Sequence, residues 1–365
     1  MKRLLISTLS VVLCVLILLP LVSCSAVKNY LESGADEEKQ TTQKQDTNKL
    51  PEKTGYQRTN LKYSFLIITE GEEVGTLGSI AYAVLDSTKP SLEVLQIPQN
   101  LFVNNSNGTV AKTYKELYQN AQSLGRSKAI ENTCHEMMAI LKTGAMLECD
   151  YYLFFDKDAI VSFTNLVGGI EVFLPFYMQF SQSSAIAGGK QKLNGSFAWN
   201  VLNYYNYAAG SELEAAKLVW SGILLSLKNT LSPEKISLFT IELRKNLYTD
   251  VPESNGVDIF FLRKLYNCPS DAIRFASIDF TAITNDNEEI SILNKPATIE
   301  RINSYFELYE TKISAEDFDP EYVFYDISSG VIFNAYNANI NNSQVFAAKD
   351  IVLGILPISQ KTETP

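Results

Sequence analysis

Strand-like segments alternate with helical ones along most of this chain, and this alternation restricts its fold more than any other feature. Three early runs are rich in β-branched and aromatic residues and are bounded by Gly, Asp-Ser or Pro: residues 63–69, 79–85 and 92–97. Between Ser127 and Gly144, apolar residues recur at helical spacing, with Ser127 placed to cap the helix start and Gly144 its end. The sequence therefore predicts an α/β domain, with α+β as the alternative, in which helices flank a mixed central sheet.

Later segments continue the same alternation. Strands are predicted at residues 151–156, 170–174 and 273–282, and helices at 158–167, 194–205, 212–229, 233–247 and 257–265. Asn194 is placed to cap one of these helices, and Gly168-Gly169 fit a backbone that needs positive φ or close approach. Because no internal repeat is present, we expect one domain over residues 61–310 and an extension over residues 311–365 that packs on it.

The amino terminus has the pattern of a secretory signal peptide. A short cationic start precedes an apolar run from Leu4 to Val22, and Leu21-Val22-Ser23-Cys24 matches the lipobox of bacterial lipoproteins. The Cys24 thiol would carry the lipid once residues 1–23 are removed. A permanent transmembrane helix is the alternative, because the run approaches the roughly 20 residues that span a bilayer.

The segment after the lipobox is polar. It is rich in Glu, Lys, Gln, Thr and Asp up to about residue 60, and it has too few apolar residues to offset the entropy of ordering. Residues 24–60 are therefore predicted to be a lipid anchor and disordered tether, which would hold the domain at the outer face of the bacterial cytoplasmic membrane. Loss of residues 1–23 leaves 29 Lys and Arg against 41 Asp and Glu, a formal charge of −12. Since nucleic acids require basic patches, the sequence argues against nucleic acid as a partner.

Cysteine and histidine usage argues against a metal centre. The folded part keeps Cys134, Cys149 and Cys268, of which the first two would pair only if the fold brought them together; separate buried thiols are the alternative. His135 is the single histidine, so no His/Cys cluster has zinc spacing. The chain also lacks GxSxG, Walker and HExxH motifs. We therefore expect neither a metal nor another cofactor.

Three segments taken in order resemble the LytR-CpsA-Psr (LCP) family: residues 79–98, 165–172 and 189–195. The resemblance extends over about residues 63–227. Members of that family look like extracytoplasmic enzymes that bind a polyprenyl-pyrophosphate-linked glycopolymer in an apolar tunnel and transfer its glycan phosphate to peptidoglycan with Mg²⁺. The resemblance implies an LCP-like fold, with arginines on the pyrophosphate and carboxylates on the metal, since buried negative charge is costly unless it is neutralised.

The residues that would carry this chemistry differ here. The family's Ile-Pro-Arg-Asp motif is Ile97-Pro98-Gln99-Asn100, so both charged groups become neutral amides. Where the family has Arg-Ser-Asp-Thr, this chain has Leu77-Gly78-Ser79-Ile80, and Ser79 replaces the metal-binding aspartate. The remaining motif positions hold Asn203 and Tyr205 for paired arginines, Ser211 for an aspartate, and Glu214 and Lys217 for two further arginines. Among these positions, only Lys217 keeps the positive charge of the family's residue.

Two interpretations of these differences remain open. One is a degenerate relative that keeps the scaffold and has lost the charged site. The other is a shifted alignment, in which arginines outside the matching segments take over: Arg126, Arg244, Arg263 and Arg274.

We expect an LCP-type envelope lipoprotein that binds a polyprenyl-(pyro)phosphate-linked glycan, peptidoglycan or an envelope partner without efficient catalysis. Tyr204, Tyr205 and Tyr207 are candidates to stack on sugar rings, although half-buried packing is the simpler alternative. Two other functions are possible on this sequence: an active glycopolymer phosphotransferase that would need Mg²⁺, and a structural or assembly lipoprotein.

Overall fold

The computed structural model describes residues 56–101, 113–204, 212–253, 256–285, 288–314, 316, 337–340 and 345–354. The chain divides into two compact units, residues 1–52 with 252–260 and residues 53–251 with 261–365. The larger unit contains everything that follows except residues 257–260, which begin a helix. The predicted signal peptide, Cys24 and nearly all of the predicted tether lie outside the described residues. Within the described part, no helix has the length and apolar character needed to cross a membrane.

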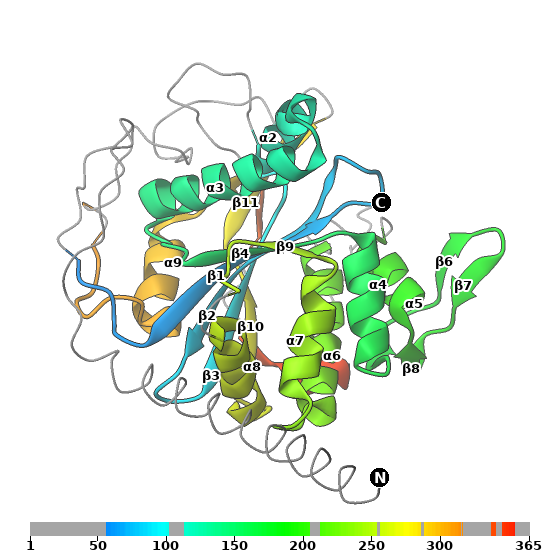
Figure 1. Ribbon diagram of the computed structural model, residues 1–365. Coiled ribbons are helices and arrows are strands. Elements are labelled where there is room, and N and C mark those ends of the chain that lie inside the picture. The colour runs from blue at the N-terminus through cyan, green and yellow to red at the C-terminus, as the bar shows by residue number, and fades with distance from the viewer. Residues whose placement is uncertain are drawn as a thin grey trace, which may run out of the picture. The chain divides into compact units, whose positions relative to one another are not determined.

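A seven-stranded mixed sheet forms the centre of the larger unit, in the order β14-β10-β3-β2-β1-β4-β9 (Figure 1). The strands are β1 (Lys62–Glu70), β2 (Leu77–Asp86), β3 (Ser91–Ile97), β4 (Tyr151–Phe155), β9 (Leu247–Thr249), β10 (Ile273–Ser277) and β14 (Phe346–Ala347). β1 pairs parallel with β4 and β3 pairs parallel with β10, whereas β2 runs antiparallel to both of its neighbours. The carboxyl ends of β1, β3, β4 and β10 therefore meet the start of β2 at one edge, which we call the carboxyl edge.

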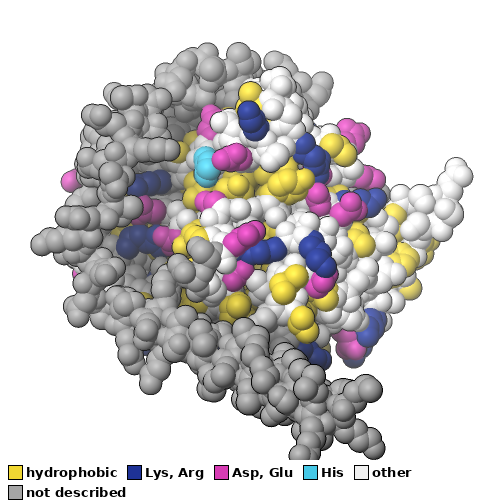
Figure 2. All heavy atoms as spheres, viewed as in Figure 1, with side chains coloured by type: hydrophobic (Ala, Val, Ile, Leu, Met, Phe, Trp, Pro, Cys, Tyr) yellow, Lys and Arg dark blue, Asp and Glu magenta, His cyan; other side chains and the backbone are white. Residues whose placement is uncertain are grey.

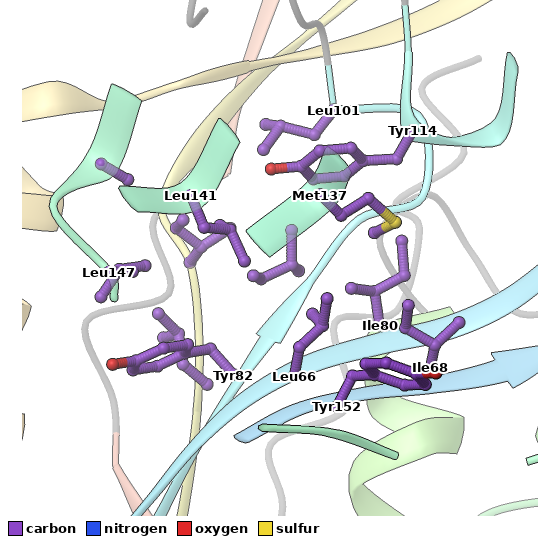
Figure 3. Close-up of a cluster of buried hydrophobic side chains, with 14 of the residues drawn as sticks. Leu66, Ile68, Ile80, Tyr82, Leu101, Tyr114, Met137, Leu141, Leu147 and Tyr152 are labelled. Carbon is purple, nitrogen blue, oxygen red and sulfur yellow. The ribbon is translucent and has the colours of Figure 1, made fainter. Parts of the chain in front are cut away.

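One face of the sheet carries a large apolar core. It is covered by α2 (Tyr114–Ala121), α3 (Arg126–Ala145), α9 (Lys295–Glu300) and the π-helix η3 (Arg301–Phe306). In Figure 3, Leu66 and Ile80 point from β1 and β2 towards Met137 and Leu141 of α3, and all four side chains are fully buried. Truncating such a leucine to alanine typically costs about 2–5 kcal/mol. The amphipathic helix predicted from the spacing of its apolar residues is thus confirmed.

The opposite face is covered by a second group of helices. They are α4 (Lys157–Leu166), α5 (Gly195–Leu202), α6 (Glu212–Thr230), α7 (Ile236–Arg244) and α10 (Ala348–Val352), and α8 (Val257–Asn267) enters the larger unit at Phe261 (Figure 1). α6 contacts β2 and β3, and its Trp220 donates a hydrogen bond to Ser79 near the start of β2. Helices on both faces of a mixed sheet confirm the predicted α/β fold.

In the part of the chain that the structure describes, three small antiparallel sheets lie outside the central one. They are β5 (Ile170–Leu174) with β8 (Gly189–Leu193), β6 (Met178–Ser181) with β7 (Ser184–Ile186), and β11 (Phe280–Asn285) between β12 (Glu288–Leu293) and β13 (Asn337–Ile340). The single strand predicted over residues 273–282 is wrong, because β10 belongs to the central sheet and β11 to another. Within the predicted extension, residues 311–365, β14 forms an edge of the central sheet. Ile351 lies in the short helix that follows β14, residues 348–352.

Two predictions that depend on the sequence of a single turn are confirmed, the Asn194 cap and the Gly168-Gly169 turn. Asn194 caps α5 by accepting a hydrogen bond from the Phe197 backbone N–H, as predicted. Gly168 and Gly169 have φ values of 80° and 85°, which side chains disfavour. Ser127 is not the cap of α3, however: Gly125 occupies that position with φ 83°, and the helix continues through Gly144 to Ala145.

Candidate functional site

Ser79, at the position of the family's metal-binding aspartate, lies at the carboxyl edge between β1 and α6. Its hydroxyl is 3.0 Å from Thr69 Oγ1, and its backbone N–H donates to the same oxygen at 2.7 Å. The Trp220 indole of α6 also donates to Ser79 Oγ, at 3.4 Å. The side chain is therefore held in a neutral network and offers no carboxylate to a metal.

Gln99 and Asn100 follow β3 at the same edge. The Asn100 side-chain oxygen accepts a hydrogen bond from the Ser291 hydroxyl at 2.8 Å, and its backbone oxygen accepts from the Ser291 N–H at 3.0 Å. The Gln99 backbone oxygen accepts from the Lys115 N–H at 3.0 Å. Asn100 thus fastens the end of β3 to β12, which is a structural role that a neutral amide performs well.

Lys217, the one motif position that keeps its positive charge, is neutralised within its own helix. Its ammonium forms an ion pair with Glu214 one turn earlier in α6, and it lies 5.8 Å from the centre of the Phe346 ring. Lys217 is only 3% exposed. Because an ammonium so deep in the protein already has a carboxylate, it has little capacity left for an incoming anion.

The motif positions after α5 are only partly described. Asn203 lies at the end of α5, where its side-chain amide donates to the Trp199 backbone oxygen at 3.1 Å. The Tyr204 ring packs against Phe176 and Phe180 at centroid distances of 6.2 and 5.6 Å. The remaining candidates, Tyr205, Tyr207 and Ser211, lie outside the described residues. The structure therefore brings Ser79, Gln99 and Asn100 to one edge and places Asn203 at the end of α5.

A charged cluster that the sequence analysis missed lies at the carboxyl edge. Glu70 ends β1 and is 3% exposed, and both of its carboxylate oxygens accept hydrogen bonds from Arg126, at 2.8 and 2.9 Å. Arg126 also donates to Asp156, which follows β4, at 3.1 Å. The Tyr118 hydroxyl and the Gly75 N–H complete the shell of Glu70. An acidic residue at the end of one strand, Glu70, and directly after its parallel neighbour, Asp156, was the signal available in the sequence.

This cluster raises the pKa of two of its members. The pKa of the Arg126 guanidinium is raised, first by its hydrogen bond to Glu70 and then by further acceptors that include Asp156. Burial raises the pKa of Tyr118 to about 12, and the negative charge of Glu70 adds to that effect. Both residues therefore stay protonated at neutral pH, and Glu70 remains surrounded by donors.

The other arginines outside the matching segments do not converge on Gln99. Arg274 forms an ion pair with Glu93 on β3, Arg244 donates to the Val251 backbone oxygen at 3.0 Å, and Arg263 is exposed on α8. Within the described part, Arg126 is thus the arginine of this group that reaches the carboxyl edge, where it is bound to two carboxylates.

The donors at this edge do not fit the Mg²⁺ site that the family resemblance implies. A hard divalent cation requires several oxygen ligands with carboxylate charge. Ser79 and Asn100 are neutral, while Glu70 and Asp156 already share Arg126. Among the described residues, no group of three or more His, Cys, Asp or Glu side chains is arranged to hold a metal.

Several polar atoms are buried without a partner where α6 faces the sheet. The Gln96 amide on β3 and the hydroxyls of Ser221 on α6 and Ser277 on β10 have no hydrogen-bond partner within the described part of the chain. Gln96 and Ser277 are neighbours in the register of β3 and β10. Such groups are costly to bury unpaired, so they favour contact with water or with polar atoms of a ligand.

The cysteines and the histidine take no part in this edge. Cys134, Cys149 and Cys268 are free thiols, so the alternative of separate thiols is the one observed. Burial raises the pKa of each, to about 11 for Cys268. The His135 side chain is 53% exposed, and its Nε2 lies 3.8 Å from Asp250 Oδ2. The sequence did not predict this partner.

Comparison with known proteins gives no match in sequence but clear matches in structure. No family model and no curated protein matches the chain. The crystal structure of B. subtilis TagV, an LCP-family protein, matches with a TM-score of 0.54 and 18% identity, covering 68% of this chain and 97% of TagV. The chain has an LCP-like fold.

Two further crystal structures have a similar fold. Protein gbs0355 from Streptococcus agalactiae has a TM-score of 0.56 at 14% identity, covering 69% of this chain and 90% of its own. EF0465 from Enterococcus faecalis, described as a transcriptional regulator, has a TM-score of 0.54 at 12% identity, with coverages of 70% and 91%. At such low identity the likeness defines the fold, and the chemistry depends on the residues present.

Proposed function

We propose that this LCP-like protein is an envelope-binding protein that holds a polyprenyl-linked glycan, or an envelope partner, without transferring the glycan efficiently. One observation carries the proposal: Arg126 at the carboxyl edge and Lys217 near the start of α6 are both already neutralised by carboxylates of the same chain. Arg126 lies between Glu70 and Asp156, and Lys217 pairs with Glu214.

The charge balance of this group argues against phosphoryl transfer. Arg126 and Lys217 carry two positive charges. Glu70, Asp156 and Glu214 carry three negative charges, so the net charge of the group is −1. A transferred phosphoryl group needs fixed donors and cations where negative charge develops. Each charge-assisted hydrogen bond that is missing gives up about 1.5–3 kcal/mol, and about 1.4 kcal/mol corresponds to a factor of ten in rate. The loss of three such contacts lowers the rate by roughly three to six orders of magnitude.

The groups that remain at the site favour a ligand bound through uncharged contacts. Unpartnered Gln96, Ser221 and Ser277 offer hydrogen bonds, and α6 also carries buried apolar side chains such as Ile223 and Leu227. This mixture suits the lipid and sugar parts of a polyprenyl-linked glycan better than its phosphates.

An active phosphotransferase is the second candidate, and one observation favours it. Arg126 lies at the carboxyl edge with 36% of its side chain exposed, so a ligand that displaced Asp156 would reach its guanidinium. In that case the metal and the phosphate would be bound by residues outside the family motifs.

The location of the protein follows from the amino terminus in this proposal. Lipid on Cys24 anchors the chain at the outer face of the cytoplasmic membrane of a bacterium, and the polar segment after it acts as the tether up to about residue 55, since Arg58 pairs with Asp150 and the Thr59 N–H donates to Leu308 on the domain. The membrane is then the first partner of the protein, through the anchor.

Two measurements on the purified full-length protein test the proposal. The first extracts bound lipid into organic solvent and identifies it by mass spectrometry; a polyprenyl chain supports the proposal, and its absence favours a purely structural lipoprotein. The second follows cleavage of a short-chain polyprenyl pyrophosphate glycan with Mg²⁺ or Mn²⁺, with an active LCP enzyme as positive control. Metal-dependent turnover that Arg126→Met abolishes would replace our proposal with the enzyme.

A further inference from the structure

Residues 172–211 form an almost uncharged part of the chain. Lys190 and Lys192 are its only charged side chains, although 20% of all residues in the protein are charged. The same segment is rich in Phe, Tyr, Asn, Gln and Ser. Its composition therefore leaves few contacts that depend on charge and favours aromatic, amide and hydroxyl contacts.

The central part of this segment is a hairpin that projects from the protein. Among the described strands, β6 and β7 pair only with each other, with Met178 opposite Ile186 and Gln179 opposite Ala185. The hairpin extends beyond α5 in Figure 1, and the same projection in Figure 2 carries apolar and uncharged polar atoms but no acidic or basic colour. An isolated two-stranded hairpin has marginal stability in water, so other contacts must hold it in place.

Aromatic rings fix this hairpin to the end of α5. The Phe180 ring meets Tyr204 edge-on at 5.6 Å and Phe197 at 6.2 Å, and Phe176 lies 6.2 Å from Tyr204. At the base of the hairpin, Gly188 passes so close to Phe176 that an added Cβ would lie 3.0 Å from its backbone. None of these four rings is fully buried. The hairpin is thus presented on a rigid aromatic base.

Exposed uncharged side chains lie along the hairpin and at its turn, with Tyr177 just before β6. Tyr177 is 59% exposed, and Gln179, Ser181, Gln182 and Ser183 are also exposed. An aromatic face packs against the C–H face of a pyranose ring, while amides and hydroxyls exchange hydrogen bonds with its hydroxyl groups. Anionic polymers and lipid head groups would require cations that the hairpin lacks. The chemistry that fits is that of an uncharged sugar.

We infer that the hairpin formed by β6 and β7, together with Tyr177 and the end of α5, is a binding surface for a neutral glycan chain. The inference rests on the proposed function only for the cellular source of the glycan. The hairpin surface is separate from the buried Gln96, Ser221 and Ser277 between α6 and the sheet. The glycan surface and the proposed lipid site can therefore be tested separately.

The test titrates the purified full-length protein with chitohexaose, a neutral oligosaccharide of N-acetylglucosamine, by isothermal calorimetry. We expect saturable binding that changes little between about 0.05 and 0.5 M salt, because no charges are involved. Tyr177→Ala should weaken binding roughly tenfold, the size expected for the loss of one stacked ring, whereas Tyr177→Phe should retain most of it.

A matched control separates loss of the surface from general damage. Leu238 on α7 is 66% exposed, close to the 59% of Tyr177, so Leu238→Ala removes a similar amount of exposed apolar surface at a distant place. It should leave the affinity unchanged, and both alanine variants should keep the melting temperature of the parent protein.

Three results would overturn the inference: no binding of chitohexaose at millimolar concentration, unchanged affinity in Tyr177→Ala, or equal weakening in Leu238→Ala. Lipid extraction distinguishes this failure from that of the proposed function. A protein that carries polyprenyl lipid but does not bind chitohexaose refutes only the hairpin surface, and the opposite pair of results refutes only the lipid-binding proposal.

Discussion

Replacing Arg126 with methionine tests whether the charged cluster at the carboxyl edge is structural or binds a ligand. The substitution keeps much of the side-chain volume but removes both hydrogen bonds to Glu70, at 2.8 and 2.9 Å, and the one to Asp156 at 3.1 Å. The Glu70 side chain is only 4% exposed, so water cannot replace the lost donors. Glu70 Oε1 keeps Tyr118 and Gly75, whereas Oε2 loses the donor it has in the described structure.

The expected cost follows from leaving this carboxylate buried. Removing one partner of a buried ion pair costs about 3–5 kcal/mol, and the 36% exposure of Arg126 argues for the lower end, about 3 kcal/mol. In urea denaturation this corresponds to a fall in the midpoint of about 1 M. The double variant Arg126→Met with Glu70→Gln should recover most of the loss, because an amide tolerates burial better than an unpaired charge.

The same variant discriminates between the two candidate functions. If Arg126 also bound the pyrophosphate of a substrate, its removal would abolish a metal-dependent turnover that the parent protein shows, and the loss of its hydrogen bonds to Glu70 and Asp156 would still lower the urea midpoint. An unchanged midpoint would therefore refute the structural role. Loss of stability with no turnover in the parent protein would support the binding protein proposed above.

Three further predictions concern the anchor, the motif and one buried acid. Cys24→Ala should release the protein from membranes or leave it unprocessed, which fractionation and fatty-acid labelling will show; labelling that persists in the variant contradicts the assignment. Gln99→Arg with Asn100→Asp should not produce metal-dependent cleavage of polyprenyl pyrophosphate, since Ser79 still lacks a carboxylate. Burial raises the pKa of Glu93 above its ordinary 4.5, so the folded state holds this proton more tightly and the free energy of unfolding falls as pH rises from 4.5 through the raised pKa. Glu93→Gln should remove that slope in urea titrations between acid and neutral pH, and an identical pH dependence would exclude Glu93 as its source.

Features set by neighbouring residues could be predicted from the sequence. The run of apolar residues in β1, β2 and β3 matches strands that are buried almost along their whole length, as expected for a sheet covered on both faces. The helical spacing that predicts α3 depends on a single face, and the Asn194 cap depends on one turn. Each of these signals is contained within fewer than about twenty residues.

Features set by distant partners could not be predicted in this way. The run 273–282 is continuous in sequence, yet β10 pairs with β3 and β11 pairs with β12 and β13, so the division depends on strands far along the chain. Arg126 lies 56 residues from Glu70 and 30 from Asp156, and no local pattern joins them. The family resemblance located the carboxyl edge through Ser79 and Gln99 but gave no information on this cluster.

The charge distribution connects the two sites proposed here. An anionic ligand must compete with Glu70 and Asp156 for the Arg126 guanidinium, and with Glu214 for the Lys217 ammonium. These two cations therefore attract an added anion only weakly. A ligand of this protein therefore gains affinity chiefly through groups that interact without charge. The exposed hairpin of β6 and β7 offers such uncharged groups. So do the unpartnered Gln96 amide and the Ser221 and Ser277 hydroxyls between α6 and the sheet. If a neutral glycan binds the hairpin with the dependence on Tyr177 predicted above, recognition by this LCP-like fold does not require the arginines that the family motif would supply.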